Sequence, residues 1–131
     1  MFDKAKLIKH WSDHAQYDIE TAKAMLEANR YPYALFMCHL AIEKLLKAIV
    51  VSRTNEHAPY THNLVVLSDA SGLSFTEEQK KLIGTLNEFN IEARYPDWQE
   101  NFYSIATPEY VQSYLSQTKE LFIWLDNSLQ K

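Results

Sequence analysis

The chain has 131 residues, of which 47% are hydrophobic and 23% are charged, and its formal net charge is −4. This length and composition are typical of one globular domain with its own core, so we expect residues 1–131 to form a single domain. The negative charge disfavours nonspecific nucleic-acid binding, which relies on a basic surface. The chain has only two glycines and four prolines, which disfavours the many tight turns of an all-β protein and favours long helices.

Cysteine content and hydropathy narrow the class of protein further. Cys38 is the only cysteine, which excludes an intrachain disulfide and a multi-cysteine zinc site. The start of the chain lacks the apolar core of a signal peptide, and no stretch reaches the roughly 18 apolar residues of a membrane span. We therefore expect a cytoplasmic protein.

The first half of the chain predicts two long helices. In residues 4–29 apolar positions recur every three or four residues, which is typical of one helix face, and the Tyr31-Pro32 pair follows its end. Pro32 also suits the first turn of a second helix. Residues 33–51 are apolar nearly all round, as in the central helix of a bundle. A polar loop is expected over residues 52–60.

A short helix and a third long helix follow. Thr61 is a candidate N-cap for the short helix, which Gly72 ends. Thr76 and Gln79 form a capping-box pattern, and an apolar stripe then continues through about Ala93. The capping box and the stripe together predict the third long helix.

Prolines delimit the rest of the chain. Pro96 disfavours helical geometry at Tyr95, so the third helix should end close to Arg94, whose charge is favoured at a helix C-terminus. A loop is expected over residues 95–106, and the last helix begins beside Pro108. The sequence therefore predicts an all-α protein, an antiparallel up-and-down four-helix bundle with one short additional helix.

Several polar side chains interrupt these apolar faces. Asp18 lies on the apolar face of the first helix, where a buried carboxylate needs a partner. In the second helix His39, Glu43 and Lys47 follow one another at a spacing of four. Glu43 and Lys47 are also placed to form a favourable helical ion pair. His62 opens the short helix.

A polar stripe runs along the third helix through Asn87, Asn90 and Arg94 and leads into Tyr95 and Asp97. Taken singly, each polar residue is explained by a hydrogen bond, a solvated ion pair or a helix end. A bundle brings the inner stripes of neighbouring helices together, however, and a polar patch on an apolar scaffold is typical of functional sites and of structural networks alike. The candidate ligand-binding residues are Asp18, His39, Glu43, Lys47, His62, Arg94, Tyr95 and Asp97.

Two other constellations are weaker candidates for chemistry. His10, His14 and Asp18 share a helix face at a spacing that can hold a metal, but they lack the glutamate arrangement of a metalloprotease helix. We expect no metal and no cofactor. Cys38 and His39 are adjacent in a helix and point about 100° apart, so Cys38 is expected to be a core residue and not a nucleophile.

Aromatic residues follow Asp97 in the predicted loop. Trp98, Phe102 and Tyr103 either stack on a base or seal the end of the bundle or a dimer contact, and the sealing role is favoured. The chain has no glycine-rich phosphate loop. A phosphate would therefore have to meet side chains such as Lys47 and Arg94.

Three segments together resemble a HEPN domain of the kind paired in prokaryotes with a minimal nucleotidyltransferase. They are "YALFMCHLAIEKLLKAIV", "THNL" and "EARYPD", and with the Asp18 helix the resemblance covers essentially the whole chain. It implies an up-and-down four-helix bundle that is usually dimeric. Such domains are often encoded beside a nucleotidyltransferase, as a toxin–antitoxin or nucleotide-handling pair.

The resemblance also permits a test for ribonuclease activity. Many family members are metal-independent endoribonucleases whose motif is an arginine, four to six further residues and a histidine. In this motif the arginine stabilises phosphoryl charge and the histidine serves as acid or base. If Arg94 is the motif arginine, the histidine positions hold Gln99, Glu100 and Asn101. The motif is incomplete, so nuclease activity is not carried over.

The expected function is that of a non-catalytic HEPN partner protein. The resemblance implies a homodimer whose polar groove binds a nucleotide or an RNA end beside a nucleotidyltransferase. Asp18 and Glu43 would accept hydrogen bonds from Arg94 or from the ligand. Arg94, Lys47 and His62 would meet phosphate.

Two alternatives remain from other classes of protein. One is an atypical ribonuclease toxin, in which His39 or His62 takes the role of the missing histidine. The other is a structural dimerisation module. Loss of RNA cleavage in Arg94→Ala would favour the first, and the absence of both cleavage and nucleotide binding would favour the second.

Overall fold

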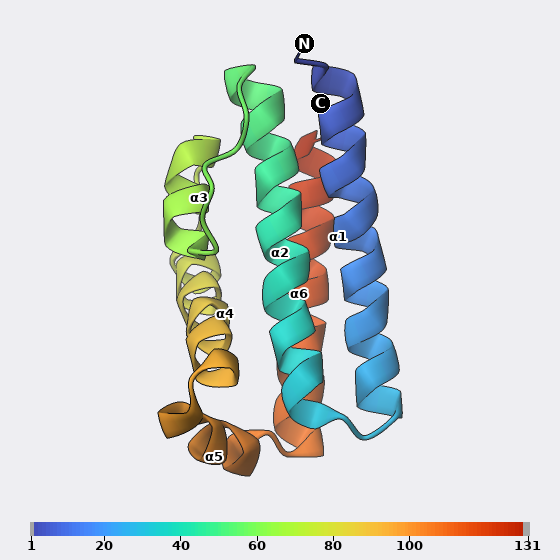
Figure 1. The fold of residues 1–131 in the computed structure, drawn as a ribbon, viewed down its shortest axis with the longest axis vertical. Coiled ribbons are helices and arrows are strands. Elements are labelled where there is room, and N and C mark those ends of the chain that lie inside the picture. Colours follow the sequence, from blue (N-terminus) through green and yellow to red (C-terminus); the bar gives the residue numbers. More distant parts are fainter. Residues whose placement is uncertain (1, 130–131) are drawn as a thin grey trace.

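Figure 1 shows the computed structural model of the chain as a bundle of helices, and it describes residues 2–129. No strand occurs within these residues. The helices in chain order are α1 (Lys4–Glu27), α2 (Tyr31–Thr54), α3 (Leu64–Ser71), α4 (Glu77–Arg94), α5 (Pro96–Ile105) and α6 (Pro108–Leu129).

The four long helices, α1, α2, α4 and α6, run alternately up and down (Figure 1). The shorter helices sit at the margins: α3 lies beside the upper part of α2, and α5 crosses the end of the bundle between α4 and α6. The start of α1 and the end of α6 lie at the opposite end of the bundle from α5 (Figure 1). This confirms the predicted antiparallel all-α bundle. In the part of the chain that the structure describes, no helix combines the length and apolarity needed to cross a membrane.

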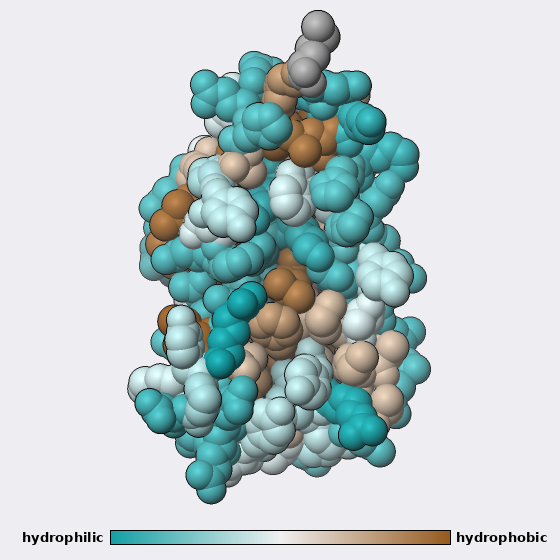
Figure 2. Space-filling view, viewed as in Figure 1, coloured by the Kyte–Doolittle hydropathy of each residue, from teal (hydrophilic) through white to brown (hydrophobic). Residues whose placement is uncertain are grey.

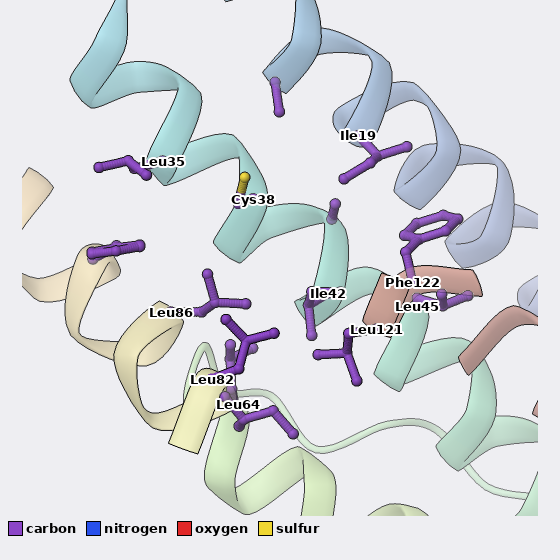
Figure 3. Packing of buried hydrophobic residues seen from close by; sticks show 14 of the residues in the cluster. Ile19, Leu35, Cys38, Ile42, Leu45, Leu64, Leu82, Leu86, Leu121 and Phe122 are labelled. Atoms are coloured by element: carbon purple, nitrogen blue, oxygen red, sulfur yellow. The ribbon is translucent and has the colours of Figure 1, made fainter. Parts of the chain in front are cut away.

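Helix α2 supplies the centre of the core, because α1, α4 and α6 all pack against it. Figure 3 shows Leu35 and Ile42 of α2 pointing into the cluster that Leu86 of α4 and Leu121 of α6 complete. Most of residues 33–51 are buried, which explains why this stretch is apolar nearly all round. Polar residues in this helix are therefore conspicuous.

Asparagines in left-handed backbone conformations end the first two helices. Asn29 has φ 62° just after α1, and Asn55 has φ 59° just after α2. Asparagine tolerates this conformation better than most residues. Helix α2 reaches Thr54, so the loop predicted from residue 52 begins three residues later than expected.

The predicted N-cap of α3, Thr61, was wrong. The N-cap is Asn63, whose side chain accepts hydrogen bonds from two backbone N–H groups of the first turn. Thr61 instead accepts a hydrogen bond from the Asn63 N–H at 3.1 Å. Gly72 ends the helix at φ 71°, as predicted. The capping box of Thr76 is also confirmed.

The loop predicted over residues 95–106 is wrong, because most of it forms α5. Tyr95 is extended, with φ −103° and ψ 126°, so Pro96 does end α4 at the expected place. The same proline then occupies the first turn of α5, where its missing N–H is not needed. Phe102 anchors α5 in the core with its ring centroid 5.7 Å from that of Phe89.

Candidate functional site

Glu43 is the centre of a buried polar network. Its side chain is 4% exposed, and the carboxylate accepts hydrogen bonds from Lys47 Nζ and from His62 Nδ1, each at 3.1 Å. His39 Nδ1 lies 3.8 Å from the same carboxylate. Four of the predicted site residues, from α2 and from the segment before α3, therefore come together around one carboxylate.

His39 is neutral in this network. Its Nε2 donates a hydrogen bond to the His62 carbonyl oxygen at 3.0 Å, because a carbonyl can only accept. Nδ1 then carries a lone pair, is buried and has no hydrogen-bond partner within residues 2–129. Burial lowers the pKa of His39 to about 4 even though the Glu43 carboxylate opposes this shift.

Lys47 is held inside the protein and not at its surface. Its side chain is 8% exposed, and Nζ lies 4.9 Å from the centroid of the Trp11 ring on α1. A cation over an aromatic face and beside a carboxylate is stabilised by both. The charges of Lys47 and Glu43 therefore offset one another.

His62 is the exposed member of the network, with 54% of its side chain accessible. Because Nδ1 donates to the Glu43 carboxylate, the other ring nitrogen carries the lone pair when the ring is neutral. A buried carboxylate that fixes the tautomer of an exposed histidine is an arrangement suited to accepting or donating a proton. It equally suits contact with a phosphate when the ring is charged.

Asp18 lies outside this network and has a different partner from the one proposed. Lys44 Nζ of α2 is 2.7 Å from Asp18 Oδ2, and within residues 2–129 no hydrogen bond joins Asp18 to Arg94. The ammonium compensates the charge of the buried carboxylate at this distance. Asp18 is nevertheless buried, as the sequence predicts.

Arg94 ends α4 and is exposed. Its Nε donates a hydrogen bond to Asn90 Oδ1 at 2.7 Å, and its guanidinium lies 5.5 Å from the centroid of the Phe36 ring. Phe36 is in turn stacked on His39, with centroids 6.3 Å apart. Arg94 therefore adjoins the Glu43 network through one aromatic ring and is not hydrogen-bonded to it.

The remaining predicted residues lie at the junction of α4 and α5. Tyr95 and Asp97 are both exposed there. Of the aromatic residues on α5, Phe102 seals the end of the bundle, whereas Trp98 is 54% and Tyr103 is 51% exposed. Of the three, Phe102 therefore seals the end of the bundle, and a dimer contact stays a prediction for Trp98 and Tyr103.

Gln99, Glu100 and Asn101 occupy the positions of the motif histidine, and their contacts are common ones at the end or on the surface of a helix. Gln99 Nε2 donates a hydrogen bond to the Ala93 carbonyl oxygen at 2.9 Å, which satisfies an unpaired acceptor at the end of α4. Glu100 and Asn101 are exposed on α5.

The structure shows how the residues of the two weaker candidate constellations are arranged. The rings of His10 and His14 pack against each other at 4.3 Å, while Asp18 faces Lys44. Across residues 2–129 no three histidine, cysteine, aspartate or glutamate side chains are grouped to hold a metal ion. Cys38 is a core residue, and burial raises the pKa of its thiol to about 12.

Sequence patterns did not single out three residues that shape this face: Trp11, Phe36 and Lys44. Trp11 and Lys47 lie the same number of residues on either side of Asn29, so an antiparallel pairing of α1 and α2 would have brought them together. No comparable signal distinguishes Lys44 as the partner of Asp18. That choice depends on how the two helices are rotated against each other.

The fold and site together define a helical bundle with a polar network on its central helix. The HEPN domain model matches residues 8–128, and the chain belongs to the HEPN family. The crystal structure of TT1696 from Thermus thermophilus is similar, with a TM-score of 0.77 over 92% of this chain and 96% of that chain. The sequence identity is 18%, so the likeness shows a shared fold. No curated protein matches the chain.

Proposed function

We propose that this HEPN domain binds a nucleotide or an RNA end on the face formed by α1, α2 and α3, as an accessory partner of a nucleotidyltransferase. The observation that carries the proposal is the Glu43 network, in which a buried carboxylate orients an exposed histidine, His62. Arg94 adds an exposed cation at the edge of the same network. In the proposal these two groups meet the phosphate.

Stability alone does not account for this network. A buried group of charged residues is seldom more stabilising than apolar residues of similar volume. His39 Nδ1 is also left without a hydrogen bond in the described structure, which is unfavourable in a buried site. In the proposal Lys47 supports Glu43 instead of contacting phosphate, because its side chain is only 8% exposed.

The proposal includes a homodimer and a toxin–antitoxin-like pairing with a nucleotidyltransferase in the cytoplasm. The support for the dimer is an apolar strip of α2 on the same face: Tyr33 is 56% exposed, and Phe36, Met37 and Leu40 are partly exposed. Figure 2 shows brown and pale side chains interrupting the hydrophilic surface over this part of α2. Sedimentation equilibrium should show a dimer that Leu40→Glu dissociates. A monomeric wild type would contradict this part of the proposal.

A second candidate is favoured by one specific observation. The tautomer that Glu43 imposes on His62 leaves the exposed ring nitrogen free to accept a proton, as a metal-independent ribonuclease requires. In that case RNA cleavage would be lost in His62→Ala and in Arg94→Ala. If RNA is bound but remains intact, the binding function holds and this candidate is rejected.

The proposed function is tested by thermal unfolding with a panel of nucleotides and short single-stranded RNAs. A ligand at about 100 times its dissociation constant adds roughly 2.7 kcal/mol, which raises the midpoint of a domain of this size by several degrees. Wild type should show this shift and Arg94→Ala should lose it. Arg53→Ala, which removes an exposed arginine at the far end of α2, is the matched control and should keep it. A shift that persists in Arg94→Ala, or no shift with any ligand, contradicts the proposal.

A further inference from the structure

One residue, His62, is held by α2 at two separate atoms. Its backbone carbonyl oxygen accepts a hydrogen bond from His39 Nε2 at 3.0 Å, and its ring Nδ1 donates one to the Glu43 carboxylate at 3.1 Å. His39 and Glu43 are four residues apart, so they are neighbours on the same side of α2. One side of this helix therefore fixes both the backbone and the ring of His62.

The loop that precedes His62 adds little to this hold. Within residues 2–129 the hydrogen bonds of the segment 58–61 are local ones. The Thr61 N–H donates to the Pro59 carbonyl oxygen at 2.9 Å, and the Asn63 N–H donates to Thr61 Oγ1 at 3.1 Å. The contacts with α2 are therefore the ones that fix the position of His62 relative to the bundle.

His39 itself is too deeply buried to touch a ligand on the surface. Its side chain is fully enclosed, and its ring is stacked on that of Phe36 with the centroids 6.3 Å apart. Phe36 in turn lies 5.5 Å from the guanidinium of the exposed Arg94. His39 therefore contacts His62 directly and also contacts the ring on which Arg94 rests. His62 and Arg94 are the two groups that meet the phosphate in the proposed function.

Packing alone does not explain a histidine at this position. A buried imidazole is unfavourable unless its polar atoms are hydrogen-bonded, and His39 Nδ1 has no hydrogen-bond partner within the described residues. A leucine of comparable volume would avoid this cost. A leucine would, however, provide no donor for the His62 carbonyl oxygen.

We propose that His39 is a positioning residue, which holds the His62 backbone so that Glu43 can fix the tautomer and direction of the His62 ring. The inference rests on the proposed function, in which the His62 ring meets a phosphate. Residues that orient a functional side chain through hydrogen bonds strongly affect its activity even though they never touch the ligand. Without the hydrogen bond from His39, part of the binding free energy would be spent on ordering the loop that carries His62.

Equilibrium binding of the pentanucleotide UUGUU to the full chain tests the inference with two variants of His39. His39→Leu removes the donor and should weaken binding about tenfold, the ratio that one oriented hydrogen bond to a charged group typically supplies. His39→Gln should bind like wild type, because its amide places an N–H near the position of Nε2. His57→Leu is the matched control, because it removes an exposed histidine of the same loop whose ring packs on Phe2, and it should also bind like wild type.

Combination with His62→Ala shows whether His39 acts through His62. If it does, the double variant of His39→Leu and His62→Ala should bind UUGUU no more weakly than His62→Ala alone, because the effects of coupled residues do not add. An effect of His39→Leu on the fold in general would instead weaken binding further in the double variant.

The tautomer of His62 provides a measurement that needs no ligand. At about pH 8 an imidazole is mostly neutral, and NMR of the ring nitrogens distinguishes its two tautomers. The His62 ring should carry its proton on Nδ1 in wild type and in His39→Gln, as the contact with Glu43 requires, and should show both tautomers in His39→Leu. If His39→Leu does not fold, His39→Asn replaces it, because the shorter amide does not reach the His62 carbonyl oxygen.

Each contrary result has a distinct meaning. The positioning role is overturned, and the proposed function stands, if His39→Leu binds UUGUU as tightly as wild type, adds its full effect to that of His62→Ala, or leaves the His62 tautomer unchanged. Failure of the wild type to bind UUGUU or any nucleotide overturns both.

Discussion

At Glu43, one carboxylate satisfies an ammonium group and an imidazole N–H while a second imidazole faces it. The network has an inner and an outer part: His39 and Lys47 are buried, and His62 reaches solvent. Such a division lets the buried groups fix the orientation of the exposed one. These contacts predict how the stability of the protein changes when Glu43 is replaced and when the pH is lowered.

Replacing Glu43 with alanine should be strongly destabilising. It leaves the Lys47 ammonium buried without its counter-charge, and breaking a buried pair in this way typically costs about 3–5 kcal/mol. Urea unfolding would measure the loss. Asp13→Ala is the matched control, because it breaks an exposed pair and should cost less than about 1 kcal/mol. Similar losses in the two variants would show that the Glu43 network is not held as described.

His39 should make stability fall as the pH is lowered. The pKa of His39 is lowered from 6.5 to about 4 in the folded protein, chiefly by burial, so the unfolded chain binds a proton more readily between these values. Stability is therefore full above pH 6.5 and is lost progressively as the pH falls towards 4, by at most about 3 kcal/mol.

The test of the pH effect is chemical unfolding at several pH values in wild type and His39→Gln. The variant should lose the part of the slope that His39 contributes between pH 6.5 and 4. Identical slopes would mean that His39 is accessible to protons in the folded state.

For single residues, the sequence predicts some contacts of the site and misses others. The position of Asp18 on an apolar face correctly predicted a buried carboxylate in need of a partner. It did not identify the partner: Arg94 was the cation proposed, and the pairing with Lys44 depends on the relative rotation of the helices. His39, Glu43 and Lys47 were predictable as a group because they share one helix face at a spacing of four.

At the scale of elements, α3 depends on two asparagines. Asn63 caps its first turn, and Asn87 of α4 accepts a hydrogen bond from the Leu64 N–H at 2.9 Å. Together they satisfy N–H groups that a helix start leaves unpaired. Asn87 thereby ties α3 to α4, and it holds in place the segment that carries His62.

Asn87→Ala should destabilise the protein by about 1–3 kcal/mol, because the Leu64 N–H loses its acceptor in a partly buried position. Asn63→Ala should cost about 1 kcal/mol through the lost cap. In both variants the backbone amides of α3 should exchange faster with solvent than those of α1 or α2. Unchanged protection of α3 in Asn87→Ala would contradict its role as the tie between these helices.

Helix boundaries were predictable where a residue favours a single local structure. Gly72 and the Thr76 capping box ended and began helices as expected. Pro96 is compatible with two local structures, because it ends α4 and also begins α5. The aromatic residue Phe102 decides between a loop and a helix there by packing on Phe89, a tertiary contact that local patterns do not reveal.

For the whole molecule, apolar periodicity was sufficient to predict the bundle. The likeness to TT1696 at 18% identity illustrates that one fold accommodates many sequences. What periodicity leaves open is which polar residues share a face. Here α2 settles it. This helix lies between α1 and α4 (Figure 1), and it contacts Asp18 through Lys44 and the Arg94 guanidinium through Phe36.

The most direct test of this arrangement is an NMR titration of the ¹⁵N-labelled protein with UUGUU. Saturation should shift the backbone signals around Lys44, His62 and Arg94 and the ring signals of His62. Signals from the groove between α4 and α6, where Glu78 and Gln117 lie, should stay unchanged and serve as the internal reference. Shifts confined to the α4–α6 groove, or no shifts when RNA is in large excess, would contradict ligand binding on the α1–α2–α3 face.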